Sequence, residues 1–216
     1  MNVVAINGSP RKNWNTATLL NKALEGAAAK NAATELIHLY DLNFKGCVSC
    51  FACKQRGGKS YGKCAYKDDL TPVLEKIEAA DALILGSPIY FGNVTGEMRS
   101  FMERLLFQYL VYDENYSSLN KTKKKTGLIY TMNVPETMIK QVGYDIVFSH
   151  IEKTFERVLG PTESLFVTDT YQFSDYSRYV ATAFDAAAKS KRREEVFPGD
   201  CEKAFAMGAR LADNSL

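Results

Sequence analysis

Several features that mark whole classes of protein are scarce or missing in this chain. Its 216 residues carry a formal net charge of only +2, so they lack the strongly basic surface that is typical of nucleic-acid binding. No apolar run approaches the length that spans a bilayer, and no basic stretch followed by an apolar stretch and a cleavage site opens the chain. We therefore expect a cytoplasmic protein that binds neither nucleic acid nor membrane and keeps its five cysteines reduced.

The common nucleotide-binding signatures are absent as well. The first glycine loop has Trp14 and Asn15 where the GxxxxGKS/T motif needs a second glycine and a lysine, and the GxGxxG fingerprint is missing. The only histidines, His38 and His150, have no carboxylate or thiol at a spacing typical of a catalytic or metal site. With no repeat, low-complexity tract or linker, we expect one domain over residues 1–216.

What the chain does contain is an alternation of short apolar runs and helical periods. The runs predict strands over 3–6, 35–40, 82–86, 126–132 and 163–168. The periods predict helices over 16–30, 69–79, 95–109, 138–159, 179–192 and 200–212. This alternation indicates an α/β protein with a five-stranded parallel sheet and helices on both faces, whose ligands bind at the carboxyl ends of the strands. Two segments stand apart, an irregular cysteine-rich insertion at 46–67 and a C-terminal helical extension at 170–216.

The loop after the first predicted strand suits an anion. Ser9, Arg11, Asn15 and Thr16 supply hydroxyl, guanidinium and amide donors that can surround a terminal monophosphate. The helix that follows directs its positive end to the same point. The alternative is a polar turn whose serine and asparagine only cap that helix.

The third predicted strand leads into Gly86-Ser87-Pro88-Ile89-Tyr90-Phe91-Gly92-Asn93, a mixture that suits a flat conjugated ring. Pro88 and Tyr90 offer rigid walls, Gly92 lets backbone N–H groups approach, and Asn93 can donate to ring acceptors. The alternative is a loop whose aromatic residues cover the core. After the fourth predicted strand, small polar groups that include Thr131 could line the other side of a ring.

Together these loops resemble a known family. Gly8-Ser9-Pro10-Arg11 with Asn15-Thr16, then Gly86 to Gly92, then Gly96 with Arg99 to Arg104, look like the NADPH-dependent FMN reductase group of flavodoxin-like proteins over residues 1–170. The resemblance implies a flavodoxin-like three-layer sandwich with strand order 2-1-3-4-5, noncovalently bound FMN, and a homodimer or homotetramer. It implies that the FMN phosphate is held by Ser9, Arg11, Asn15 and Thr16, and that the isoalloxazine faces Pro88, Ile89, Tyr90, Phe91, Gly92 and Asn93.

Four cysteines gather in the insertion. Cys47, Cys50 and Cys53 form a C-x2-C-x2-C motif, and Cys64 follows after ten residues. Three closely spaced thiolates can reach three corners of a cubane cluster, and a fourth thiol would complete it. The segment resembles the motif of iron–sulfur flavoproteins, a branch of the same family with a 4Fe-4S cluster beside FMN, although the fourth cysteine follows sooner in that branch. A zinc site, a reversible disulfide and unliganded thiols near the flavin are the alternatives.

The resemblance implies a flavin-dependent oxidoreductase in which no side chain is itself the catalyst. FMN would accept a hydride from NAD(P)H and pass electrons to a small acceptor such as a quinone or free flavin, or to the cluster if one is present. A noncatalytic electron carrier and a flavin-free signalling domain on the same fold are the alternatives. A surplus of aromatic residues predicts a subunit interface over the flavin, formed by Tyr109, Tyr112, Tyr116, Tyr171, Phe173, Tyr176 and Tyr179.

Overall fold

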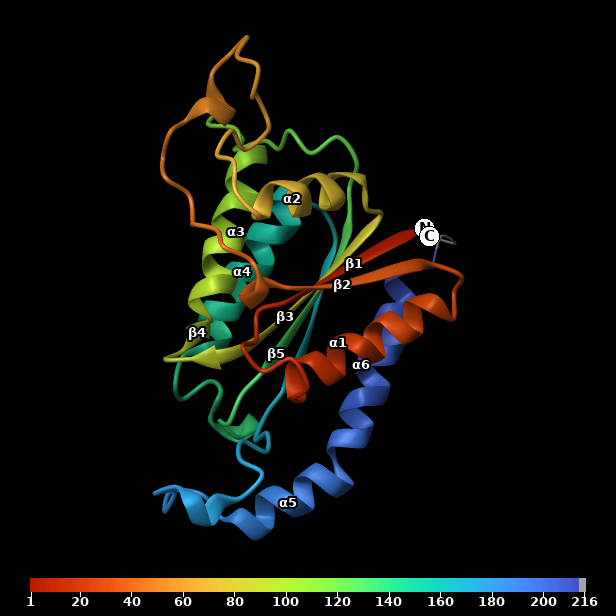
Figure 1. The fold of residues 1–216 in the computed structure, drawn as a ribbon, viewed down its shortest axis with the longest axis vertical. Helices are drawn as coiled ribbons and strands as arrows, with labels where there is room; N and C mark the ends of the chain where they lie inside the picture. Colours follow the sequence, from red (N-terminus) through yellow and green to blue (C-terminus); the bar gives the residue numbers. More distant parts are fainter. Residues whose placement is uncertain (214–216) are drawn as a thin grey trace.

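A computed structural model describes residues 1–213, in which strands and helices alternate along the chain (Figure 1). The strands are β1 (Asn2–Asn7), β2 (Ala33–His38), β3 (Ala82–Tyr90), β4 (Asn93–Val94), β5 (Lys125–Thr131) and β6 (Thr162–Val167). The helices are α1 (Asn15–Ala28), α2 (Leu70–Ala79), α3 (Gly96–Tyr109), α4 (Tyr144–Val158), α5 (Ala186–Glu195) and α6 (Phe197–Leu211). Short 3-10 turns cover Leu39–Asp41, Ala52–Lys54, Glu136–Met138 and Tyr176–Arg178.

The parallel strands lie in the order β2-β1-β3-β5-β6, which confirms the predicted 2-1-3-4-5 arrangement. The prediction of five strands omits β4, a two-residue strand that pairs antiparallel with the end of β3. The reason is that β3 runs four residues beyond its predicted end at Gly86. Backbone pairing with β5 continues as far as Pro88 opposite Thr131, so the segment predicted as a loop is largely extended.

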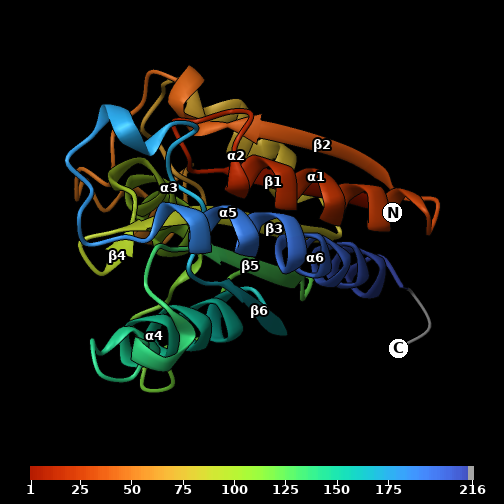
Figure 2. The ribbon, with the colours of Figure 1, turned by 90° about the horizontal axis from the view of Figure 1, so that it is seen from below.

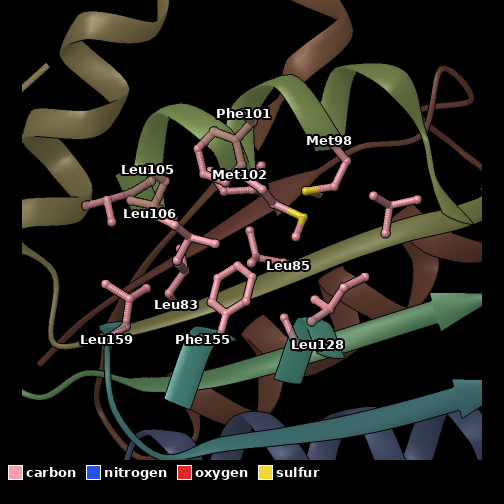
Figure 3. Packing of buried hydrophobic residues seen from close by; sticks show 14 of the residues in the cluster. Leu83, Leu85, Met98, Phe101, Met102, Leu105, Leu106, Leu128, Phe155 and Leu159 are labelled. Atoms are coloured by element: carbon pink, nitrogen blue, oxygen red, sulfur yellow. The ribbon is translucent and has the colours of Figure 1, made fainter. Parts of the chain in front are cut away.

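Helices cover both faces of the sheet, as the sequence predicts (Figure 1). Side chains alternate along β1 because successive residues of a strand point to opposite faces. Val4 and Ile6 join the core beneath α2, α3 and α4, where Figure 3 shows Met98, Phe101 and Met102 of α3 directed at the strands. Val3 and Ala5 join the core beneath α1 and α6.

The C-terminal extension supplies one of these covering helices. A Cβ atom at Gly208 of α6 would lie 1.7 Å from the carbonyl oxygen of Ala23, and one at Gly26 of α1 would lie 1.9 Å from that of Phe205. Glycine at both positions therefore lets α1 and α6 approach backbone to backbone. Because α5 is followed directly by α6, this contact also anchors α5 (Figure 2).

Two predicted helices begin later than expected. The helix predicted over 138–159 starts at Tyr144, because Gly143 before it has a left-handed φ of 73° that interrupts the helical backbone. The helix predicted over 179–192 starts at Ala186, where Asp185 caps it by accepting hydrogen bonds from the N–H groups of Ala187 and Ala188. Of the helices within residues 1–213, none is long and apolar enough to cross a membrane.

Candidate functional site

A cleft opens at the carboxyl ends of β1, β3, β5 and β6, where the sheet order predicts a ligand site. The predicted cofactor-binding residues that line this cleft are Ser9, Arg11, Asn15, Thr16, Pro88, Ile89, Tyr90 and Thr131. The fold therefore brings together residues from three separate loops, the phosphate loop (residues 8–16) among them.

Hydrogen bonds fold the phosphate loop around Ser9. The Ser9 N–H donates to Asn7 Oδ1 at 3.0 Å, and the Ser9 Oγ accepts from the Arg11 N–H at 3.1 Å. The Gly8 N–H donates to the carbonyl oxygen of Gly86 at 2.8 Å, and Thr95 Oγ1 donates to the carbonyl oxygen of Gly8 at 2.7 Å. These bonds tie the loop to the end of β3 and to the start of α3.

Three side-chain donors converge beside this loop. Arg11 donates to the carbonyl oxygen of Gln172 at 2.7 Å, and Trp14 Nε1 and Asn15 Nδ2 donate to that of Tyr171 at 3.1 and 2.8 Å. The Arg11 guanidinium also lies over the Trp14 ring, 4.2 Å from its centroid. Donors gathered on two adjacent acceptors mark a place where an anion with several oxygens could bind.

The start of α1 adds a positive end to the same place. Its N-cap is Trp14, which makes no side-chain capping hydrogen bond, and its first turn carries no acidic residue. The N–H groups of a helix start have no partner within the helix, so they remain available to a ligand. This result argues against the alternative in which the serine and asparagine of the loop only cap the helix.

Below the loop, two of the predicted residues link the start of α1 to the sheet. Thr16 and Thr131 are both buried, and their hydroxyl oxygens lie 2.8 Å apart in a hydrogen bond. This bond joins the phosphate loop to the end of β5.

The predicted ring-binding segment divides at the end of β3. Pro88, Ile89 and Tyr90 line the cleft, whereas Phe91 and Gly92, which form the turn, and Asn93, which begins β4, lie outside its lining. Phe91 and Gly92 have left-handed φ values of 49° and 81°, and the Phe91 side chain is fully exposed. Contact of these three residues with a ring stays a prediction.

The cleft has further walls that the sequence interpretation did not assign to the cofactor. Met132 and Asn133 come from the polar segment after the fourth predicted strand that was expected to line a ring; the unassigned walls are Trp14, Thr170, Tyr171 and Gln172. The last three follow β6, so the rule that ligands bind at carboxyl strand ends would have found them had it been applied to that strand. Trp14 lies inside the phosphate loop itself, but the interpretation of that loop considered only its hydroxyl, amide and guanidinium donors and not the indole N–H.

The four cysteines of the insertion also come together, in a second and separate pocket. Cys47, Cys50, Cys53 and Cys64 all line it, with Arg104 and Phe107 of α3. All four are free thiols in this structure, and Cys53 is the most buried of them. Burial raises the pKa of the Cys53 thiol.

Arg104 holds this pocket in place. Its side chain is 1% exposed, and all five of its N–H donors have acceptors. Nε donates to Cys64 Sγ at 3.0 Å, and the two terminal nitrogens donate to both carboxylate oxygens of Asp68 and to the carbonyl oxygens of Lys45 and Tyr66. Burial alone would raise the pKa of Asp68, but hydrogen bonds from Arg104 and the backbone of Lys45 outweigh it and keep that pKa below its ordinary value.

A second cation closes the other side of the cysteine segment. Lys54 donates to the carbonyl oxygens of Phe107 and Leu110, at the negative end of α3. The cysteine segment therefore lies along the carboxyl half of α3, while the cleft lies at the start of that helix (Figure 1). A helix of 14 residues spans about 21 Å, so the two pockets are not adjacent within one chain.

Within residues 1–213, no three or more His, Cys, Asp or Glu side chains are grouped as ligands of one metal ion. A 4Fe-4S cluster is larger than an ion and takes one thiolate at each of four irons. Four thiols around one pocket, with a guanidinium on one of them, match the donor chemistry of such a cluster.

Known proteins share the amino-terminal part of the chain. A model of the family described as NADPH-dependent FMN reductase matches residues 1–133. An iron–sulfur flavoprotein of Methanocaldococcus jannaschii is 40% identical over 104 residues, which are 48% of this chain and 51% of that protein. The chain thus spans about half the length of the curated relatives it matches.

Solved structures share the whole fold. An NAD(P)H:quinone oxidoreductase from Methanothermobacter marburgensis superposes with a TM-score of 0.71 at 15% identity, covering 100% of this chain and 99% of that one. An FMN-dependent NADH-azoreductase from Bacillus anthracis, in complex with FMN, superposes with a TM-score of 0.65 at 14% identity, covering 99% and 100%. At these identities the likeness establishes the fold alone.

Proposed function

The chain belongs to the NADPH-dependent FMN reductase family, and on that premise we propose that it binds FMN in the strand-end cleft and acts as an NAD(P)H-dependent oxidoreductase on a small acceptor. The observation that carries the proposal is the convergence of Arg11, Trp14 and Asn15 donors beside the uncapped start of α1. When bound, FMN would supply the chemistry, which is acceptance of a hydride and transfer of its two electrons, together with protons, to an acceptor such as a quinone or free flavin.

The phosphate loop would hold the phosphate with Ser9, Arg11, Asn15 and Thr16. Arg11 and Asn15 now donate to neutral backbone carbonyls of residues 171 and 172. A phosphate dianion is a stronger acceptor, since hydrogen bonds to a charged group are roughly twice as strong as neutral ones. When FMN binds, Arg11 and Asn15 would therefore exchange weak backbone acceptors for the stronger phosphate oxygens. Neither donor would be left with water as its acceptor.

The walls of the cleft would hold the ring. Pro88 and Ile89 are half-buried at the end of β3, and Thr131 and Met132 are buried at the end of β5. These residues give two rigid sides, because Pro88, Ile89 and Thr131 belong to paired strands and the Met132 N–H donates to the carbonyl oxygen of Val167. Phe91, Gly92 and Asn93 would contact the ring from the turn beyond Tyr90.

The test is a titration of the FMN-free protein with FMN, followed by NADPH and NADH oxidation with a quinone as acceptor. We expect saturable binding with one FMN per chain and turnover that depends on added FMN. A protein that binds no FMN would overturn the proposal. A protein that binds FMN but shows no turnover with either nicotinamide would be an electron carrier instead.

We also propose that Cys47, Cys50, Cys53 and Cys64 hold a 4Fe-4S cluster, which would supply one-electron chemistry. The support is the shared pocket of the four thiols and the names of the relatives. Anaerobically purified protein should contain about four irons and four sulfides per chain. The Cys50→Ser variant should lose them, and Cys201→Ser, which changes a cysteine of α6, should not. Protein with neither iron nor sulfide would contradict this assignment, and stoichiometric zinc would favour the zinc alternative.

A homodimer or homotetramer is the remaining part of the proposal. Tyr171, Phe173, Tyr176 and Tyr179 contact one another beside the cleft, with the Phe173 and Tyr179 rings stacked 4.1 Å apart. Such an aromatic group, with Tyr179 53% exposed, suits a subunit interface. Light scattering of the full chain should give two or four times the monomer mass, and a monomer at high concentration would rule the oligomer out.

A further inference from the structure

Helix α5 lies outside the part of the chain that matches the family and crosses below the carboxyl ends of the strands (Figure 1). It carries four cations in five residues, Lys189, Lys191, Arg192 and Arg193. A helix so rich in charge would ordinarily turn its cations to water. Here Lys189 is 5% exposed and Arg193 is half-buried, whereas the side chain of Lys191 is 72% exposed.

Arg192 is also turned inward, where it pairs with Asp200 of α6, and the other two inward cations share one face of the helix. Lys189 and Arg193 are four residues apart, which places them one turn apart on the same side. Seen from below, α5 lies in front of the strands beside α1 (Figure 2). Each of the two cations reaches the side-chain oxygen of an asparagine that lines the cleft.

Arg193 determines how Asn15 is turned. Its guanidinium donates to Asn15 Oδ1 at 2.8 Å and lies over the Phe197 ring, 3.9 Å from the centroid. Burial lowers the pKa of Arg193, but the ordinary pKa of an arginine is so high that the guanidinium stays charged. Because a guanidinium only donates, the oxygen of Asn15 must face α5 and its NH2 group must face the cleft, where it meets the carbonyl of Tyr171.

Lys189 does the same for Asn133. Its ammonium donates to Asn133 Oδ1 and to the carboxylate of Asp169, and it lies 3.4 Å from the carbonyl oxygen of Asn133. An ammonium can only donate hydrogen bonds, so the oxygen of the Asn133 amide faces α5 and the NH2 group faces the opposite way. Asp169 balances the buried charge, which explains how a lysine can stay buried there.

We propose that α5 is a positioning helix for the cofactor: Arg193 and Lys189 set the amides of Asn15 and Asn133 so that both NH2 groups point at bound FMN. This inference rests on the proposed function. Asn15 would donate to the phosphate, and Asn133, at the end of β5, would donate to the ring or the ribityl chain. The cations themselves touch the cofactor only through these amides.

The experiment measures the affinity of the full chain for FMN and for riboflavin, which lacks the phosphate, by quenching of flavin fluorescence. Arg193→Met should weaken FMN binding about tenfold and leave riboflavin binding within about twofold. Lys189→Met should weaken both flavins about equally, by about tenfold. Lys191→Met, a change on the outer face of the same helix, is the matched control and should change neither.

A double-mutant cycle separates positioning from mere support of the fold. In an Asn15→Ala background, Arg193→Met should cause no further loss of FMN affinity, because the amide that it positions is gone. Arg193→Lys, which keeps a donor, should recover part of the loss. If the single variants lose stability, titrations of the fraction that remains folded still report the FMN-to-riboflavin ratio.

The possible outcomes distinguish failure of this inference from failure of the proposed function. Variants that bind both flavins as the parent does would overturn this inference and leave the proposed function intact, and so would equal losses of FMN and riboflavin in Arg193→Met. A parent protein that binds no FMN would overturn the proposed function and this inference with it.

Discussion

The strand-end cleft and the cysteine pocket stand at opposite ends of α3 and are built by different means. The cleft rests on backbone pairing, because Asn7 is opposite Gly86 and Pro88 is opposite Thr131 in the parallel ladder. The cysteine segment contains no strand, only the turn at Ala52–Lys54, and depends on side chains of α3. The shape of the cleft therefore depends on the backbone pairing of the sheet, whereas the shape of the cysteine pocket depends on a few side-chain hydrogen bonds.

This difference has a consequence for how each pocket responds to change. Loss of one side chain at the cleft removes a contact with the proposed cofactor but leaves the ladder in place. Loss of Arg104 removes the group that joins Lys45, Cys64, Tyr66 and Asp68 to α3. Damage at the cleft should appear in binding, and damage at the cysteine pocket should appear in folding.

The largest expected effect comes from Arg104→Met. It leaves the carboxylate of Asp68 and two carbonyls without their buried donor, so the free energy of unfolding should fall by about 3–5 kcal/mol. Urea unfolding measures the change. Arg99→Met on the exposed side of the same helix should cost less than about 0.5 kcal/mol. Equal stability of the two variants would contradict the role given to Arg104.

Arg11→Met should act on binding instead of folding. A lost hydrogen bond to a charged group is worth about 1.5–3 kcal/mol, so the Kd for FMN should rise roughly ten- to hundredfold. The free energy of unfolding should change by less than about 0.5 kcal/mol because Arg11 is exposed. Lys12→Met, which removes an exposed pair with Asp41, is the control, and a similar loss of affinity in both would argue against a specific phosphate contact.

A smaller effect is expected at the bond between Thr16 and Thr131. Thr16→Val leaves the buried Thr131 hydroxyl unpaired, which should cost about 1–2 kcal/mol of stability. The double variant Thr16→Val with Thr131→Val removes both partners, so it should be more stable than the single variant. Thermal unfolding of the two proteins checks this order, and a double variant less stable than the single would count against it.

The smallest expected effect is a change in the stability of the Asp68→Asn variant at acidic pH. Because the pKa of Asp68 is depressed in the folded protein, its carboxylate adds stability above its unfolded pKa of about 3.9, and that stability is lost as pH falls through the lower folded pKa. Urea midpoints measured from pH 7 to pH 3 should therefore fall less steeply for Asp68→Asn than for the parent. Asp69→Asn is the neighbouring control, and an unchanged slope in Asp68→Asn would refute the linkage.

Local sequence patterns predicted most of the sheet and half of the cleft. Val3 to Ile6 and Ala82 to Leu85 are apolar runs typical of buried parallel strands, and their order followed from the family resemblance. Ser9, Arg11 and Asn15 could be assigned because they follow a strand and precede a helix, which is a local relationship. The same holds for Cys47, Cys50 and Cys53, whose C-x2-C-x2-C spacing is a local pattern and which line one pocket.

Partners distant in the chain could not be predicted in this way. The acceptors for Arg11 and Trp14 are carbonyls of residues 172 and 171, and backbone carbonyls carry no residue-type signal. The length of β3 depended on its pairing with β5, which a run of Ser87, Pro88 and Ile89 does not display. Cys64 lines the cysteine pocket as one of the four predicted thiols, but its donor Arg104, which lies 40 residues away in α3, gave no signal in the sequence.

By itself, the sequence determined the α/β alternation, the donor-rich composition of the first loop and the thiol-rich insertion, because each depends on residues close together in the chain. Only the tertiary structure decided that the cleft and the cysteine pocket lie at opposite ends of α3, and that Lys189 and Arg193 of α5 reach back to Asn133 and Asn15. The physical reason is that such contacts are selected by the packing of α6 on α1 and by the pairing of charges buried together, which periodicity along the chain does not encode.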